Sequence, residues 1–254
     1  MSNISYSAIR TILFYEIKIF FREFQFNIIA PLISTCLFVF ILYTVQHYYS
    51  TDTQEGSYMN FLIPGIIIML VIQTSYNHLS EVIISMKQCG SFNDYLTSPI
   101  SRSEIFISFI LSSIVVCSFV GLLNLILLSF FADFSNINYF NMFFYLILTI
   151  VIFSSIGASV GFISFTWDFK SSISDFFVTP LSFLSGTIFS INVIEAKWKF
   201  IFDYNPIYYL VKGFRNSFND YNFNFFQDLA LFLFTFIFFI ISLLIFKKGY
   251  KVVL

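Results

Sequence analysis

Six long apolar runs dominate the chain, and short polar segments separate them. A helix needs about 20 apolar residues to cross the hydrocarbon core of a bilayer. The runs have about this length, and Asp175 is the one charged residue inside them. The pattern therefore predicts an all-α membrane protein with six transmembrane helices, at residues 26–46, 58–79, 105–132, within 139–165, 173–191 and 229–246.

Residues 1–25 precede the first run and are too charged for a signal peptide, whose apolar core follows a short basic start. At 100° per residue, Lys18 and Arg22 lie opposite a narrow apolar arc formed by Ile9, Leu13, Ile17, Phe20 and Phe24. This pattern is typical of an amphipathic helix that lies in the membrane interface. A core-facing helix of a soluble domain would show the same pattern, but no soluble domain follows. We therefore expect an interfacial N-terminal helix.

A polar segment, residues 85–104, separates the second and third runs. Gly90 and Pro99 interrupt it, and it carries charges that hydrocarbon would not tolerate, at Lys87, Asp94, Arg102 and Glu104. The part between the two breakers, residues 91–98, is long enough for a short helix lying across a membrane face. A solvated loop is the simpler interpretation of such a segment. The alternative is a surface on which something outside the membrane acts.

Residues 192–228 form the longest segment between runs, and half of them are apolar. Asn205-Pro206 divides the segment, because proline cannot continue the preceding helix and restricts the residue before it. Two short amphipathic helices that dip into the membrane fit this pattern. Irregular backbone at membrane depth is tolerated where protein or water satisfies it. We therefore expect a re-entrant hairpin packed against other spans, between the fifth and sixth transmembrane helices.

Composition supports the membrane assignment and limits the chemistry. The chain has 254 residues, of which 58% are hydrophobic and 11% charged, with a mean hydropathy of +0.84. A soluble domain carries about 25% charged residues. The net charge of −1 argues against electrostatic binding of nucleic acid. Three cysteines and two histidines match no metal spacing, and the sequence has no catalytic triad, carboxylate pair or phosphate-binding glycine loop, so we expect no enzyme and no metal site.

The distribution of basic residues sets the expected orientation, because cytoplasmic loops are enriched in Lys and Arg. Nine lie on the side of the termini: Arg10, Lys18, Arg22, Lys87, Arg102, Lys170, Lys247, Lys248 and Lys251. Four lie on the other side, all within residues 192–228: Lys197, Lys199, Lys212 and Arg215. We therefore expect both termini in the cytoplasm and the 192–228 segment at the outer leaflet.

At this point the chain resembles a known family over essentially its full length: the type-2 permeases of ATP-binding-cassette (ABC) transporters. Three motifs carry most of the resemblance. Residues 61–66, FLIPGI, are similar to the family's FLxPG motif, and residues 90–104 are similar to its polar loop with SPIS and a following Glu. Residues 184–187, LSGT, followed by Trp198, Asn205-Pro206 and Arg215, are similar to a third stretch. The N-terminal helix with its proline-bearing first span is the fourth and weakest match.

The resemblance implies a membrane subunit that binds no nucleotide itself. It implies a single permease domain over residues 1–254, a homodimer in the cytoplasmic (inner) membrane, and two copies of a separate cytoplasmic ATPase that holds ATP and Mg. Residues 85–104 would then be the loop that couples the ATPase to the spans, through Gly90, Leu96, Ser98, Pro99, Ile100, Ser101, Arg102 and Glu104. The re-entrant segment would act in gating through Gly186, Trp198, Asn205, Pro206 and Arg215.

The implied function is export of an amphipathic molecule, such as a lipid, a lipid-linked glycan or a drug-like compound. A polysaccharide or O-antigen-type glycan exporter is the alternative within the family and would have an open, aromatic-lined channel across the dimer. A non-transporting membrane scaffold is the alternative of a different class. A secondary transporter would need ionisable residues at the bilayer midplane and usually inverted repeats, and the sequence shows neither.

A few residues within the spans carry separate hypotheses. Asp175 is a candidate pathway residue because it lies in a span, or else a headgroup-level carboxylate paired with Lys170. Glu81 is expected to pair with Lys87 or Arg102 beside the coupling loop. Pro64-Gly65 and Pro180 are hinges or simple kinks. Three small residues at helical spacing, Ser154, Gly157 and Gly161, predict close helix packing.

Overall fold

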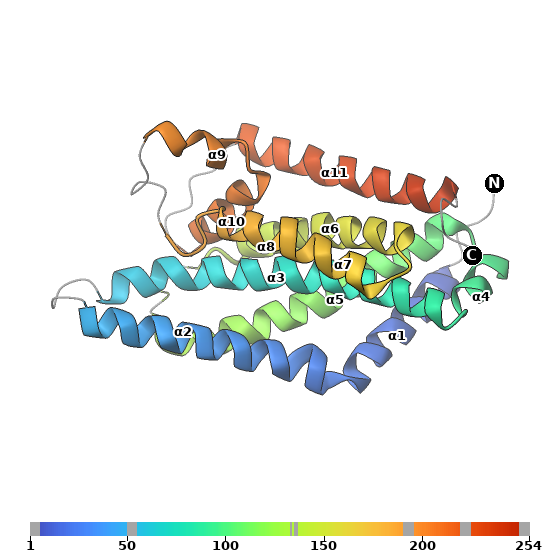
Figure 1. Ribbon diagram of the computed structural model, residues 1–254, viewed down its shortest axis with the longest axis horizontal. Coiled ribbons are helices and arrows are strands. Elements are labelled where there is room, and N and C mark those ends of the chain that lie inside the picture. The colour runs from blue at the N-terminus through green and yellow to red at the C-terminus, as the bar shows by residue number, and fades with distance from the viewer. Residues whose placement is uncertain are drawn as a thin grey trace.

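The computed structural model describes residues 6–49, 55–132, 134, 137–189, 196–218 and 225–248, and every regular element within them is helical. The expected all-α architecture is therefore confirmed. Figure 1 shows long helices lying side by side along one direction. The long ones are α2 (Ala30–Tyr49), α3 (Glu55–Gln88), α5 (Arg102–Leu128), α6 (Tyr139–Ile163) and α11 (Phe225–Lys248).

Some of the short elements lie at the two ends of this bundle, whereas α7 (Trp167–Ile173) and α8 (Thr179–Phe183) lie along its middle (Figure 1). At one end lie α4 (Phe92–Thr97), the start of α1 (Tyr6–Arg22) and the end of α11. At the other end lie α9 (Phe200–Asp203) and α10 (Pro206–Asn216), beside the start of α3. We call these the α4 end and the α10 end. The remaining short elements are η1 (Gln25–Ile29), η2 (Ser129–Phe131), η3 (Ser174–Val178) and η5 (Ala196–Trp198).

Among the described residues, five helices are long and apolar enough to cross a membrane, at 25–46, 58–88, 102–131, 139–163 and 226–248. They correspond to the predicted first, second, third, fourth and sixth spans. The predicted fifth span, 173–191, has a different form, because α7, η3 and α8 make a helical run over residues 167–183. The chain then turns, and Gly186 adopts a φ of 70°, which favours glycine over other residues. Residues 190 and 191 lie outside the described part of the chain.

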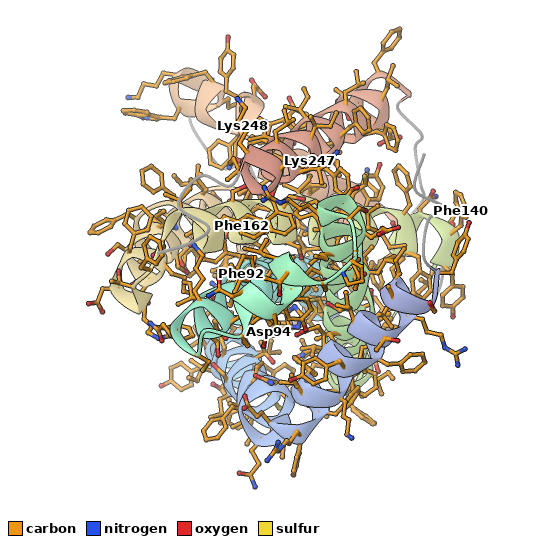
Figure 2. All side chains as sticks on the ribbon, turned by 90° about the vertical axis from the view of Figure 1, so that its right-hand side faces the viewer. Phe92, Asp94, Phe140, Phe162, Lys247 and Lys248 are labelled. Carbon is orange, nitrogen blue, oxygen red and sulfur yellow. The ribbon has the colours of Figure 1, made fainter. Side chains whose placement is uncertain are left out.

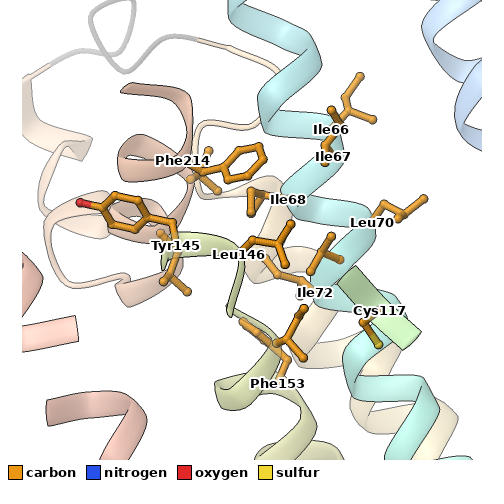
Figure 3. Close-up of a cluster of buried hydrophobic side chains, with 14 of the residues drawn as sticks. Ile66, Ile67, Ile68, Leu70, Ile72, Cys117, Tyr145, Leu146, Phe153 and Phe214 are labelled. Atoms are coloured by element: carbon orange, nitrogen blue, oxygen red, sulfur yellow. The ribbon is translucent and has the colours of Figure 1, made fainter. Parts of the chain in front are cut away.

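Helix α3 forms the centre of the bundle. Its side chains pack on α6 and α5 along most of its length and on α10 near its start. Figure 3 shows Ile66, Ile68 and Ile72 of α3 among residues of these three neighbours. With 34 residues, α3 is about 50 Å long, which exceeds the roughly 30 Å of the hydrocarbon core. It therefore runs the whole way from the α10 end to the α4 end.

Close packing of α3 on α6 depends on small residues, as the sequence predicted. A Cβ atom added at Gly157 would overlap the main chain of Tyr76, and one added at Gly161 would press on Ile83. Ser154 donates a hydrogen bond to the Ser75 carbonyl at 3.4 Å. Small side chains let two backbones approach closely, which increases their van der Waals contact inside a membrane.

Helix α1 packs on α5 with a face that differs slightly from the predicted apolar arc. Its buried residues are Ile12, Glu16 and Phe20, whereas Phe24, assigned to the arc, is 46% exposed. Lys18 and Arg22 are exposed, as the pattern predicted. The difference arises because the helix buries one side against protein, and that side includes Glu16, an acidic residue outside the predicted apolar arc.

Candidate functional site

The predicted coupling segment forms a short helix between two defined breaks. Gly90 ends α3 with a φ of 74°, and its N–H donates to the Lys87 carbonyl at 3.2 Å. After α4, Ser98 and Pro99 lead to Ser101, which begins α5. There the Ser101 hydroxyl accepts from the Glu104 N–H at 3.3 Å, and the Glu104 carboxylate accepts from the Ser101 N–H at 2.8 Å. This capping box fixes the angle at which α4 meets α5.

An aromatic cluster holds α4 against the bundle. Phe92 is 2% exposed, and its ring centroid lies 6.3 Å from that of Phe162 on α6 and 6.0 Å from that of Phe246 on α11. Phe162 and Phe246 stack at 4.7 Å, and Phe106 of α5 lies against Phe162 at 6.5 Å. Figure 2 shows Phe92 and Phe162 together at the centre of this end. Sequence analysis did not select Phe92, because the chain is rich in phenylalanine and nothing in the sequence distinguishes this one from the others.

The predicted coupling residues divide into two faces. Leu96 and Ile100 pack partly buried on the cluster around Phe92, and Glu104 is 6% exposed. The side chains that face outward are Asn93, Asp94, Thr97, Pro99 and Arg102. Of the eight residues expected to contact a partner, the structure therefore exposes Gly90, Pro99 and Arg102 and gives the others mainly structural positions.

Polar contacts tie the α4 end to three other helices. The Lys87 ammonium donates to the carbonyls of Phe162 and Ser164, where α6 ends. Arg102 donates to the Lys247 carbonyl of α11 at 2.6 Å. The Trp167 indole N–H donates to the Gln88 side chain at 2.8 Å. The residues that flank α4 therefore link α3 and α5 to α6, α7 and α11.

The ion pairs predicted in this region were wrong. Glu81 pairs with Lys170 at 2.6 Å, whereas Lys87 and Arg102 donate to backbone carbonyls. Asp175 therefore does not form the ion pair with Lys170 that was one of its two predicted roles. Its side chain is exposed in η3, a π-helix. The sequence could not choose among these pairs, since nothing in it states which faces of α3 and α7 meet.

At the α10 end, the Arg215 cluster (Phe61, Gly65, Gly186, Thr187 and Arg215) brings two sequence motifs together, the FLIPGI motif and the stretch from LSGT to Arg215. The guanidinium donates to the carbonyls of Phe61, Gly186 and Thr187 at 2.9, 3.0 and 3.1 Å, and lies 3.6 Å from the centre of the Phe61 ring. A Cβ atom at Gly65 would overlap the Thr187 carbonyl. Arg215 and Gly65 thus hold the turn after α8 directly on α3.

Asn205 holds the same turn from a second side. It is 4% exposed, and its side-chain amide donates to the Leu181 carbonyl at 3.1 Å and to the Ser185 hydroxyl at 3.0 Å. Its carbonyl oxygen caps α10 by accepting from the Ile207 N–H at 3.0 Å, and Pro206 takes the first helical position, where no N–H is needed. Trp198, in contrast, is 52% exposed, and the contact described for its ring is Lys197 at 5.9 Å.

Tyr145 joins α10 to α6 and α11, and sequence analysis did not identify it. Its hydroxyl donates to the Asp228 carboxylate, and its ring fills the space that the missing side chain of Gly213 leaves. Both Tyr145 and Asp228 are buried. The predicted hairpin residues 192–195 and 219–224 lie outside the described residues; the described part, α9 and α10, packs on the bundle mainly through α10.

Two adjoining cavities lie along α3. The first, of about 380 Å³, lies towards the α4 end and is lined by α1, η1, α3 and α5. The second, of about 460 Å³, continues along α2 and α3 as far as Phe183 of α8. The π-helical segment η1 lines this region through Phe26 and Asn27, and such segments occur frequently at functional sites.

Comparison with known proteins shows the family to which this chain belongs. Residues 7–219 match the family model described as "ABC-2 type transporter". The chain is also similar to the inner membrane transport permease YadH of Escherichia coli strain K12, of E. coli O157:H7 and of Shigella flexneri. In each case 28% of 218 residues are identical, covering 86% of this chain and 85% of the relative. The chain therefore belongs to the ABC-2 type transporter family and is a membrane transport permease.

Proposed function

We propose that this chain is the membrane-spanning subunit of an ATP-driven exporter of amphipathic molecules. In this proposal two copies form a homodimer, and two copies of a separate cytoplasmic ATPase, which holds ATP and Mg, dock on the α4 end. The substrate is a lipid, a lipid-linked glycan or a drug-like compound. The permease contributes the pathway, and the hydrolysis takes place on its partner.

The construction of the α4 end carries this proposal. A six-residue helix presents Asn93, Asp94 and Thr97 outward, and its other face places Phe92 in the aromatic cluster behind it. Nucleotide can drive a conformational change only through contacts that differ between two states. A polar surface held rigidly on four helices is suited to transmit such a difference. A scaffold would need no such surface.

We further propose six spans, with the α7–η3–α8 run as the fifth and with α9 and α10 as a re-entrant hairpin at the outer leaflet. Both termini and the α4 end then lie on the cytoplasmic side of a bacterial inner membrane. Buried hydrogen bonds from Asn205 and Arg215 support this arrangement, since they satisfy the carbonyls of an irregular turn at membrane depth.

Co-purification with the ABC ATPase of an adjacent reading frame tests the proposal. We expect the wild-type permease to retain the ATPase and Asp94→Arg to lose it, because Asp94 faces outward at the α4 end. The matched control is Asp203→Arg, an exposed charge reversal at the α10 end, which should bind normally. Retention by Asp94→Arg, or no ATPase bound to the wild type, would contradict the proposal and favour the scaffold. Leu96→Asp is unsuitable, because Leu96 packs inward.

Cys89 provides a native probe of orientation. It is exposed next to Gly90, whereas Cys117 is buried and Cys36 is partly buried. A membrane-impermeant maleimide should label Cys89 in inside-out vesicles and not in intact cells, with Cys89→Ser as the control. Labelling from the outside would reverse the proposed topology.

A further inference from the structure

The cavity of about 380 Å³ beside α1, which we call the acidic cavity, is lined by three carboxylates from different parts of the chain. Glu16 comes from α1, Glu23 from the turn before η1, and Glu81 from α3. Lysine and arginine are absent from its described lining. Among the described residues, the one cation bonded to this set is Lys170, which approaches Glu81 from α7. The lining therefore carries an excess of negative charge.

Glu16 is the unusual member of this set. It is 2% exposed, and its Oε1 atom has no hydrogen-bond partner among the described residues. Buried carboxylates are normally paired or hydrogen-bonded, since an unpartnered buried charge is costly. A side chain held in this state at a cavity wall is poised for a ligand that supplies the missing positive charge.

A few polar side chains lie beside the carboxylates of the acidic cavity, and most of the remaining lining is apolar. His78 lines it, and its Nδ1 atom lies 3.0 Å from the Ser113 hydroxyl. Asn27 donates its amide to the Phe20 carbonyl at 3.2 Å, and Asn77 and Thr74 complete this side. These groups make room for a polar head without adding a competing cation.

The second cavity, of about 460 Å³, extends the acidic cavity along α2 and α3. The two share Phe26, Pro31, Thr74 and Asn77 in their linings. Beyond these residues the wall becomes more apolar, through Phe38, Ile66, Met69, Leu70 and Phe183. The combined shape is a charged head site joined to a mostly apolar tail site.

We propose that these joined cavities bind an amphipathic cation, with its ammonium head beside Glu16 in the acidic cavity and its hydrocarbon part between α2 and α3. This inference rests on the proposed transport function and specifies its substrate class. Glu16 and Glu23 supply the attraction, and the apolar wall of the second cavity supplies burial of the tail. A neutral or anionic amphiphile of the same length would lack the electrostatic attraction to Glu16 and Glu23.

The titration of Glu16 gives the proposal a pH signature. Burial raises the pKa of the Glu16 carboxyl from 4.5 to about 7. The ionisable groups that face it are Glu23, His78 and Glu81 with its partner Lys170, together with Cys117 on α5 and Tyr95 on α4. Because a cation prefers the ionised carboxylate, its affinity should rise with pH, by about tenfold from pH 6 to pH 8.

Trp167 makes the test direct, because it lines the acidic cavity. The permease would be purified without ATPase, in zwitterionic lipid discs and with Trp198→Phe, so that Trp167 is the one tryptophan. The probe is a hexadecyldimethylammonium amphiphile with a nitroxide on its head, which quenches nearby tryptophan. The uncharged hexadecanoylamide of the same nitroxide is the comparison.

We expect saturable quenching by the cation, weakened about tenfold by Glu16→Gln and about threefold by Glu23→Gln. Asp168→Asn is the matched control, since this exposed carboxylate is next to Trp167 and outside the cavity lining. The pH dependence should disappear in Glu16→Gln. Equal quenching by the uncharged probe, or equal affinity in the wild type and both Glu variants, would overturn the proposal.

Competition identifies the source of the cation. A two-chain trimethylammonium lipid placed in the disc represents a membrane lipid, and dodecyltrimethylammonium added from solution represents a soluble compound. Displacement of the probe by one of them supports the proposal and names the source, whereas displacement by neither contradicts it. Because no ATPase is present, failure here leaves the proposed export function standing. Conversely, if the permease bound no ATPase in the co-purification, the measured binding of the cation to the purified permease would still hold.

Discussion

The two ends of the bundle are held together by different kinds of contact. At the α4 end, aromatic rings from four helices meet around Phe92, and polar side chains remain on the outside. At the α10 end, the polar side chains of Arg215 and Asn205 turn inward and bond backbone carbonyls. The first arrangement leaves hydrogen-bonding capacity for a partner, whereas the second uses its capacity within the chain. This difference is the basis on which we propose docking at the α4 end and gating at the α10 end.

Phe92→Ala should have the largest effect and should break the α4 end alone. Removing a buried phenylalanine typically costs about 3 kcal/mol or more, because a cavity remains. We expect a lower melting temperature in detergent and loss of ATPase co-purification. Phe140→Ala, at an 80% exposed ring, is the control and should change neither. Normal ATPase binding by Phe92→Ala would show that the cluster is not needed to present α4.

Arg215→Met should break the α10 end and spare the other. Three carbonyls lose a charged donor, which should destabilise the fold by about 2–3 kcal/mol. ATPase binding should persist, and transport should be lost because the turn after α8 is released. Lys212→Met, an exposed cation one turn earlier, is the control. Equal effects of Phe92→Ala and Arg215→Met on ATPase binding would mean that the two ends do not act separately.

Gly65→Ala should produce a smaller loss, of about 2 kcal/mol, because a Cβ atom there overlaps the backbone carbonyl of Thr187 as well as the Arg215 side chain. Gly121→Ala is the matched control in another span, where the nearest atom is a Val71 methyl group. Thermal unfolding in detergent compares the two. A larger shift for Gly121→Ala would contradict the close contact of Gly65 with Thr187.

The smallest predicted effect is a change of thermal stability with pH, which depends on Glu16 in the region between the two ends. The folded-state pKa of Glu16, about 7, is above its ordinary value of 4.5, so its protonated form contributes stability that is complete below pH 4.5 and lost as pH rises through 7. Between pH 6 and pH 8 this loss is about 1 kcal/mol. Melting temperature should therefore fall over this range in the wild type and less in Glu16→Gln. An unchanged slope in Glu16→Gln would exclude Glu16 as the titrating group.

The sequence predicted features that depend on local chemistry. Apolar length located five of the spans, Gly90 and Pro99 bounded α4, and Asn205-Pro206 marked the start of α10. It placed the end of the second span at residue 79, whereas α3 continues to Gln88, because hydropathy reports where a membrane ends and not where a helix ends. The fifth helical run begins at Trp167 for the same reason.

Long-range pairing was beyond prediction from one sequence. The partners of Arg215 are backbone carbonyls, which every residue has, so no residue type indicates them. The choice of Lys170 by Glu81 depends on how α7 lies against α3. The burial of Glu16 depends likewise on the rotation of α1 about its axis against α5. Each of these requires the packed arrangement of helices that lie far apart in the chain.

The bond from Arg215 to Phe61 has a consequence for how the protein is made. The two residues are 154 positions apart, so α3 is synthesised and inserted long before its last partner exists. Until α10 arrives, the Gly65 surface of α3 lacks its cover, and the turn after α8 lacks the donor for two of its carbonyls. A chain that ends before α10 therefore lacks the contacts that fix the turn after α8 on α3, and docking of α10 supplies them.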